Sequence, residues 1–132
     1  MKSRHQNQSF FGLTFISTSE ETNGQYFQSS TLIPAGDPGP PPHIHGNEDE
    51  GFYVKSGELT FIINDEEIVV KEGEYINIER GEKHSWRNDS SYTAELIITF
   101  SPAGIEKMFE ELDKDPSNIL EIGKKYGTDF LL

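Results

Sequence analysis

The sequence predicts an all-β fold, a barrel or sandwich of short strands, followed by a short helical tail. Short segments of mixed apolar and polar residues recur from about residue 9 to residue 101, with Gly, Asn, Asp or Pro between them. The hydrophobic period becomes helical only after residue 103. At 132 residues the chain is expected to form one domain, with the barrel over about 9–101 and a helical extension over about 103–132.

The expected strands are short, and a turn signal separates most of them from the next. In chain order they cover residues 10–17, 25–33, 43–45, 51–56, 58–64, 68–71, 74–78, 84–87 and 92–100. Between the second and third lies a proline-rich stretch, 34–42. Proline fixes φ and lacks an N–H donor, so this stretch is expected to be stiff and extended without joining a sheet.

The tail has the spacing of two amphipathic helices. Apolar residues recur at helical intervals between acidic and basic ones, at Ile105, Met108, Phe109 and Leu112. A second short helix is expected over 119–126, stopped by the glycine that follows. These helices are expected to cap the barrel or to contact a second subunit.

Composition narrows the classes of partner. The net charge is −12, from 11 basic and 23 acidic residues, which disfavours nucleic acid and anionic membranes. No apolar stretch approaches the roughly 20 residues of a membrane span, and the first eight residues lack the apolar core of a signal peptide. A cytoplasmic protein is therefore expected. The chain has no cysteine, so any metal must rest on nitrogen and oxygen ligands.

Two histidines one residue apart begin the main candidate site. Residues i and i+2 of a strand point to the same face, so His43 and His45 are expected to aim their imidazoles the same way. With Glu50 and His84 they form an N3O set that suits one divalent transition metal: Fe, Mn, Ni, Cu, Co or Zn. A metal that prefers five or six ligands keeps one or two positions open, as catalysis requires.

Three consecutive acidic residues, Glu48, Asp49 and Glu50, compete for the carboxylate position. Glu50 is preferred because it shares strand parity with Phe52 and Val54, which are expected to face the barrel interior. Asp49 would point the other way.

Two segments of the chain resemble the two motifs of the cupin family. Residues 36–57 resemble the first motif, in which a glycine precedes His-x-His, a glutamate and a second glycine. Residues 73–88 resemble the second, with its glycines, histidine and closing asparagine in register. This chain departs by one extra residue before His43 and by Glu79 where a proline is usual, and neither is a ligand position. The tail, 119–132, resembles the C-terminal extension of small quercetin-dioxygenase-like cupins.

The resemblance implies a cupin double-stranded β-helix, a jelly-roll barrel, with a metal on the four ligands above. It also implies a metal-dependent dioxygenase that acts on a small aromatic or enol-type substrate, with Glu50 as ligand and catalytic base. An aromatic interior is expected to bind the substrate through Phe52, Phe61 and Trp86, with Ile76, Phe100 and Tyr75 also inside. A metal-dependent isomerase of sugars or other small molecules and a non-catalytic ligand-binding module are the alternatives.

Further residues near the site have candidate roles. Gln28, Asn77 and Asn88 could orient metal ligands, and the cationic side chains of Arg80, Lys83 and Arg87 could bind an anionic group. A homodimer is expected because the edge strands of an acidic barrel need cover. Its contacts are expected to be the N-terminal strand and the helices of 105–126.

Overall fold

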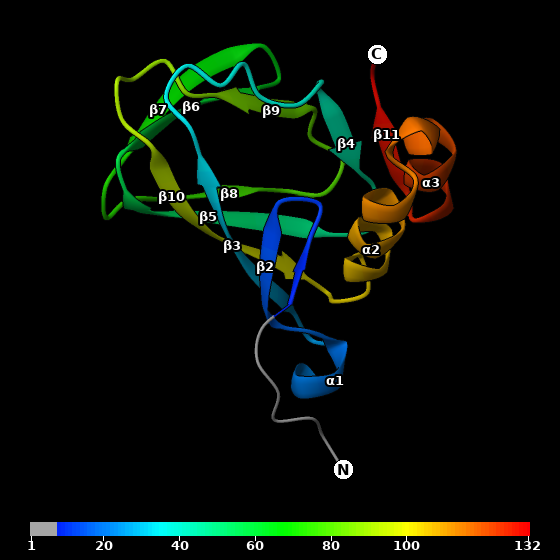
Figure 1. Ribbon diagram of the computed structural model, residues 1–132. Helices are drawn as coiled ribbons and strands as arrows, with labels where there is room; N and C mark the ends of the chain where they lie inside the picture. Colours follow the sequence, from blue (N-terminus) through cyan, green and yellow to red (C-terminus); the bar gives the residue numbers. More distant parts are fainter. Residues whose placement is uncertain (1–7) are drawn as a thin grey trace.

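The computed structural model of the chain describes residues 8–132 (Figure 1). In chain order its elements are β1 (Ser9–Phe10), β2 (Leu13–Ser17), α1 (Ser19–Thr22), β3 (Phe27–Ile33), β4 (His43–His45), β5 (Asp49–Ser56), β6 (Glu58–Ile63), β7 (Glu66–Lys71), β8 (Tyr75–Ile78), β9 (His84–Arg87), β10 (Ala94–Ser101), α2 (Glu106–Lys114), the 3-10 turn η1 (Pro116–Asn118), α3 (Ile119–Lys125) and β11 (Thr128–Phe130).

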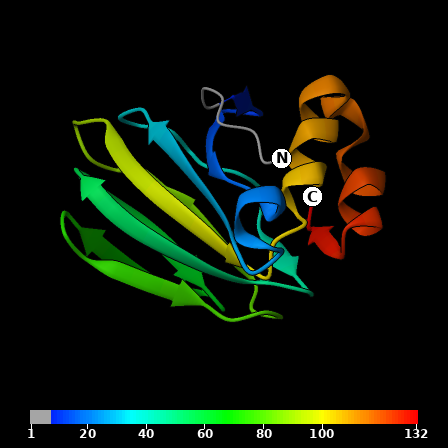
Figure 2. The same cartoon turned by 90° about the horizontal axis from the view of Figure 1, so that it is seen from below.

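The strands form two facing sheets, which confirms the expected double-stranded β-helix. One sheet has the order β1-β2-β3-β10-β5-β8, and the other has the order β11-β4-β9-β6-β7. The pairings within these two sheets are antiparallel. Figure 2 shows α2 and α3 side by side at one end of the strands, where β11 also lies. No helix within residues 8–132 is long and apolar enough to span a membrane.

Every second side chain along the strands points inward and fills the space between the sheets. Along β10, Ala94, Leu96, Ile98 and Phe100 are buried, while the residues between them are only partly covered. The ring of Phe100 stacks on that of Phe27, with 5.9 Å between centroids. Burial of such side chains contributes about 1.5–3 kcal/mol each. The adjacent strands β3, β10 and β5 thereby contribute the core of the sheet that carries Glu50.

The N-terminal region differs from the single strand expected there. Residues 10–17 were expected to be one strand, but they form the hairpin β1–β2 around a turn at Phe11 and Gly12. Both residues have positive φ, 52° and 79°, the geometry of a tight hairpin turn. The helix α1 that follows was not expected, although Thr18 and Glu21 form the capping box that begins it.

The tail confirms both helices and adds a strand. Ile105, Met108 and Leu112 are completely buried, as their helical spacing predicts. Gly127, with φ of 78°, ends the second helical segment. The chain then returns as β11, which pairs with β4, so the extension is not purely helical as expected. The proline-rich stretch lies outside both sheets, as predicted.

Candidate metal centre

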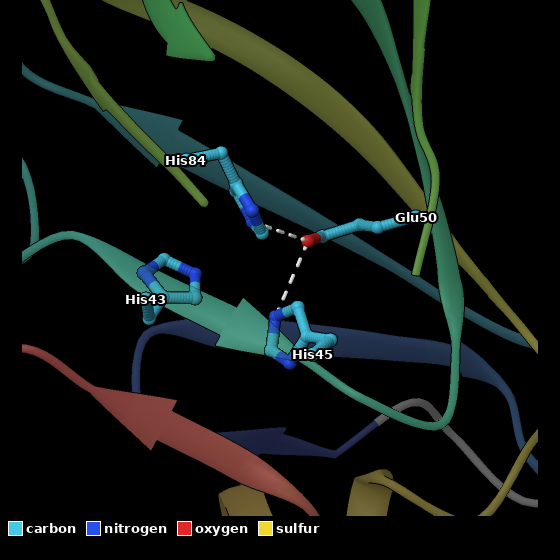
Figure 3. Close-up of side chains that lie close together, drawn as sticks. All are labelled: His43, His45, Glu50 and His84. Carbon is cyan, nitrogen blue, oxygen red and sulfur yellow. Dashed lines mark hydrogen bonds and ion pairs between the residues drawn. The ribbon is translucent and has the colours of Figure 1, made fainter. Parts of the chain in front are cut away.

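The four predicted ligands meet between the two sheets. His43 and His45 lie on β4 and His84 lies on the neighbouring strand β9, while Glu50 reaches across from β5 of the opposite sheet (Figure 3). One potential ligand atom from each residue lies within 4.8 Å of the others, and all four side chains are buried. The structure therefore brings together every ligand predicted from the sequence.

Strand register explains the geometry. His43 and His84 are direct partners across the β4–β9 pair, so their imidazoles lie side by side with ring centroids 4.3 Å apart. His45 projects from the same face of β4 two residues further on. Oε1 of Glu50 lies 3.0 Å from Nε2 of His84 and 3.3 Å from Nε2 of His45. The carboxylate therefore faces the imidazole nitrogens.

Each imidazole is held in place by a partner at its Nδ1 atom. The distances are 2.9 Å from His43 to the carbonyl oxygen of Pro41, 2.8 Å from His45 to Oγ1 of Thr128, and 3.0 Å from His84 to the carbonyl oxygen of Glu82. A carbonyl oxygen accepts a hydrogen bond from the Nδ1–H group, which assigns Nε2 as the ligand atom. The Thr128 hydroxyl can serve His45 in the same way, which is the outer support that metal-binding histidines usually have.

The carboxylate and the histidines are electrostatically coupled. Burial would raise the pKa of Glu50, but hydrogen bonds from His45 and His84 outweigh it and hold the pKa at about 2. Burial and the neighbouring histidines lower the pKa of His43 to about 3. Burial also lowers the pKa of His84, but the hydrogen bond and charge of Glu50 outweigh it and leave the pKa above its usual value. Glu50 is thus an ionised ligand at neutral pH, and His43 is a neutral one.

The other two acidic residues of the 48–50 run do not join the cluster. Asp49 points away, as predicted, and pairs with Arg80 at 3.2 Å. Glu48 is buried, and burial raises its pKa. Its Oε1 has no hydrogen-bond partner among residues 8–132.

This arrangement fits a divalent transition metal. Three imidazoles with fixed Nδ1 atoms and one ionised carboxylate form a borderline N3O donor set, which iron, manganese, cobalt, nickel, copper and zinc all accept. The donors come from two sheets that the core holds rigidly, so the site is preorganised. The donor set does not distinguish between these metals.

A cavity of about 280 Å³ opens beside the ligands. Its lining includes His43, His45 and Glu50 together with a largely apolar wall. The aromatic members of that wall are Phe11, Trp86, Phe100, Phe109 and Phe130. The cluster of ligands is therefore accessible from an apolar, aromatic chamber.

The three residues predicted to bind the substrate differ in whether they line the cavity. Trp86 lines the cavity, whereas Phe52 and Phe61 do not contribute to its lining and are completely buried in the core. Phe52 packs against Trp86 with ring centroids 5.4 Å apart, and Phe61 packs at 6.5 Å. Both phenylalanines therefore support the wall from behind. Tyr75, also expected inside, is 60% exposed.

The three amides expected to orient ligands make their hydrogen bonds elsewhere. Gln28 donates to Thr99 across a strand pair, and Asn77 accepts from Tyr75 on the surface. Asn88 is buried, but its amide donates to the carbonyl oxygens of Ile33 and Tyr92 and so fixes the turn before β10.

The three cations form ion pairs on the surface of the protein. Arg80 pairs with Asp49, Lys83 pairs with Asp65, and Arg87 pairs with Glu67 and Asp89. None of the three lines the cavity.

Sequence reasoning missed the contribution of the C-terminal strand. Thr128 is 1% exposed and pairs in register with His45, which places its hydroxyl at the imidazole. Phe130 lies against His43, with ring centroids 5.5 Å apart. The strand covers only three residues after a glycine turn, so the alternation that reveals longer strands is too short to detect.

Comparison with known proteins agrees with this geometry. Residues 30–100 match the family model described as "Cupin domain". The chain is 29% identical over 97 residues to the quercetin 2,3-dioxygenase of Bacillus subtilis (strain 168), a match that covers 74% of this chain and 28% of that protein. It is 32% identical over 75 residues to "Oxidoreductase iacF" of Pestalotiopsis fici, covering 56% of this chain and 37% of that protein. The chain thus spans about a third of the length of these relatives.

A solved structure shows the same fold. The crystal structure of a predicted oxalate decarboxylase from Thermotoga maritima superposes with a TM-score of 0.64 and 22% sequence identity. The match covers 68% of this chain and 78% of that one. The family model covers more than half of the chain, and the two sheets and the ligand cluster agree with it, so the protein belongs to the cupin family.

Proposed function

We propose that the protein is a metal-dependent dioxygenase that acts on a small aromatic or enol-type substrate. The observation that carries this proposal is the position of the ligand cluster, which borders an apolar cavity of about 280 Å³ with aromatic walls. A cavity of this size and lining suits a small planar molecule. The similarity to a quercetin 2,3-dioxygenase and to a second oxidoreductase supports oxidative chemistry.

Each residue of the site has a distinct role in this proposal. His43, His45 and His84 would hold the metal through Nε2, with their rings fixed at Nδ1. A bound divalent metal supplies a Lewis acid and, for redox-active ions, access to O2 chemistry. Glu50 borders the cavity and is ionised, but its low pKa makes it a weak base. As the proposed catalytic base it would therefore take a proton from a substrate hydroxyl whose pKa the metal had lowered by binding it. Trp86, held by Phe52 and Phe61, would pack against the substrate ring.

The cavity suits one of the alternative functions, a sugar isomerase, less well. A sugar isomerase needs several polar side chains to hold hydroxyl groups. Besides the metal ligands, the polar side chains of residues 8–132 that line this cavity are those of Thr31 and Asp37. The lining therefore favours an apolar ligand.

Oxygen uptake by the metal-loaded protein tests the proposal. A panel of flavonols, diketones and phenols would be assayed with O2 and under nitrogen, with the metal-free protein as control. A dioxygenase consumes one O2 per substrate and incorporates both atoms of ¹⁸O2 into product. Equal turnover without oxygen would favour an isomerase, and tight binding without turnover would favour a binding module. We also propose that the protein acts in the cytoplasm as a homodimer.

A further inference from the structure

Part of the cavity lining comes from segments that flank the part of the chain matching the cupin model. Phe11 and Leu13 come from the β1–β2 hairpin, Met108 and Phe109 come from α2, and Phe130 comes from β11. The family match covers only residues 30–100. These five residues therefore lie outside the matched segment, and they line the same cavity as the metal ligands.

Phe11 has a backbone conformation that a bulky residue rarely adopts. Its φ is 52°, in the left-handed region, where the side chain crowds the backbone. The other non-glycine residues with positive φ among those that the structure describes are Asn23, Asn64 and Asp65, which tolerate this region. The Phe11 side chain is also 40% exposed, so core burial does not compensate for the unfavourable conformation. The two-residue turn requires positive φ here, so phenylalanine carries a conformational cost that asparagine or glycine would avoid, and a role for its side chain in the cavity would account for that choice.

Two hydrogen bonds hold the hairpin tip in place. The N–H of Phe11 donates to Oδ1 of Asp113 on α2 at 2.7 Å. The hydroxyl of Thr31 on β3 donates to the carbonyl oxygen of Gly12 at 2.9 Å. The tip is therefore tied both to the barrel and to the C-terminal extension, which fixes Phe11 at the cavity mouth.

The charge of the cavity lining limits the charge that a bound ligand can carry. Among residues 8–132, no lysine or arginine lines the cavity, and the charged side chains that line it beyond the histidines are those of Asp37 and Glu50. An anionic group on the part of a ligand that lies away from the metal ligands would have no cation of these residues to pair with, and burying it would be costly. That part of the ligand must be uncharged.

We propose that Phe11 is the specificity-determining residue of this site and packs against the uncharged aromatic ring of the substrate at the cavity mouth. This inference rests on the proposed function, because it takes the cavity as the substrate site. An aromatic ring at the mouth selects a planar partner through edge or offset stacking. In this proposal the β1–β2 hairpin selects the substrate, while β4, β5 and β9 carry the metal ligands.

Fluorescence titration of the zinc-loaded protein with 2-naphthol tests the proposal, because zinc is redox-silent and the probe is not consumed. Phe11→Asn removes the ring and should raise Kd about three- to tenfold. Its melting temperature should be unchanged or higher, because asparagine tolerates positive φ. Phe11→Tyr should bind like the wild type. The matched control is Tyr26→Asn, which removes an aromatic side chain of the same 40% exposure outside the cavity and should leave Kd unchanged.

A second probe tests whether the cavity rejects a ligand with a negative charge away from the metal ligands. In 6-hydroxy-2-naphthoate the same ring carries a carboxylate at the end away from the hydroxyl, and it should bind more weakly than 2-naphthol. Equal Kd values for Phe11→Asn and the wild type would overturn the inference, as would absent naphthol binding or tighter naphthoate binding. Binding that depends on Phe11 without any oxygen uptake across the substrate panel would overturn only the dioxygenase function.

Discussion

Replacing Thr128 with valine tests whether the C-terminal strand is part of the metal centre. Valine has nearly the same shape as threonine but lacks the hydroxyl, which lies 2.8 Å from Nδ1 of His45. Thr128 is 1% exposed, so water cannot easily replace that oxygen. The variant therefore leaves a buried imidazole N–H unpaired and removes the contact that fixes the ring.

The magnitude follows from two independent estimates. An unpaired buried polar group costs about 1–3 kcal/mol. Loss of an outer partner of a metal-bound histidine typically lowers metal affinity about 10- to 100-fold, or about 1.4–2.7 kcal/mol. The two ranges overlap, so we expect Thr128→Val to weaken metal binding by about one to two orders of magnitude.

Titration with Co²⁺ measures both affinity and geometry. Calorimetry gives Kd, and the visible absorption of bound cobalt reports the ligand arrangement. The control is Thr128→Ser, which keeps the hydroxyl and should retain an affinity and spectrum close to those of the wild type. If Thr128→Val binds Co²⁺ with wild-type affinity and an unchanged spectrum, the hydroxyl does not position His45 and the reasoning fails.

Three other predictions concern pH, packing and assembly. Glu50 holds the pKa of His84 above the usual 6.5, so the metal-free site retains a proton that the metal must displace. Metal affinity should therefore rise with pH, by up to about tenfold per unit until that pKa is passed, and then level off; a pH-independent Kd from pH 6 to 8 would contradict this. Phe61→Ala should lower the free energy of unfolding by about 3–5 kcal/mol in denaturant titration, because the side chain is completely buried. The exposed Leu32→Ala should change it little, and equal losses would refute the packing assignment. Light scattering should give a dimer, and a particle of 14.9 kDa at micromolar concentration would rule this out.

The metal ligands could be predicted from the sequence because their placement is a local property. His43 and His45 project from one face of a strand by simple alternation, and Glu50 belongs to the inward-facing set of the next strand. Alternation also predicted that Asp49 would point outward.

The substrate wall was harder to predict because facing inward does not mean lining the cavity. Glu50 and Phe52 share one face of β5, but only Glu50 lines the cavity. Phe52 instead packs against Phe61 and Trp86 in the core. Position along the strand relative to the mouth decides between core and cavity, and it depends on how the sheets are arranged in three dimensions.

Contacts between distant parts of the chain could not be predicted at all. Thr128 lies 83 residues from His45 in sequence, and Phe11 lies 102 residues from Asp113. Each contact is made by a short element whose pattern is too brief to read. Both contacts join parts of the chain that are far apart in sequence beside the ligands or the cavity, and no local pattern reveals them.

Elemental analysis of the purified protein tests the central claim most directly, because that claim is a single metal held by His43, His45, Glu50 and His84. We predict about one divalent transition metal per chain in the wild type and a large loss in His84→Ala. The matched control is Asp49→Asn, which changes the outward-facing neighbour of Glu50 and should retain the metal. Equal metal content in the wild type and His84→Ala would contradict the account.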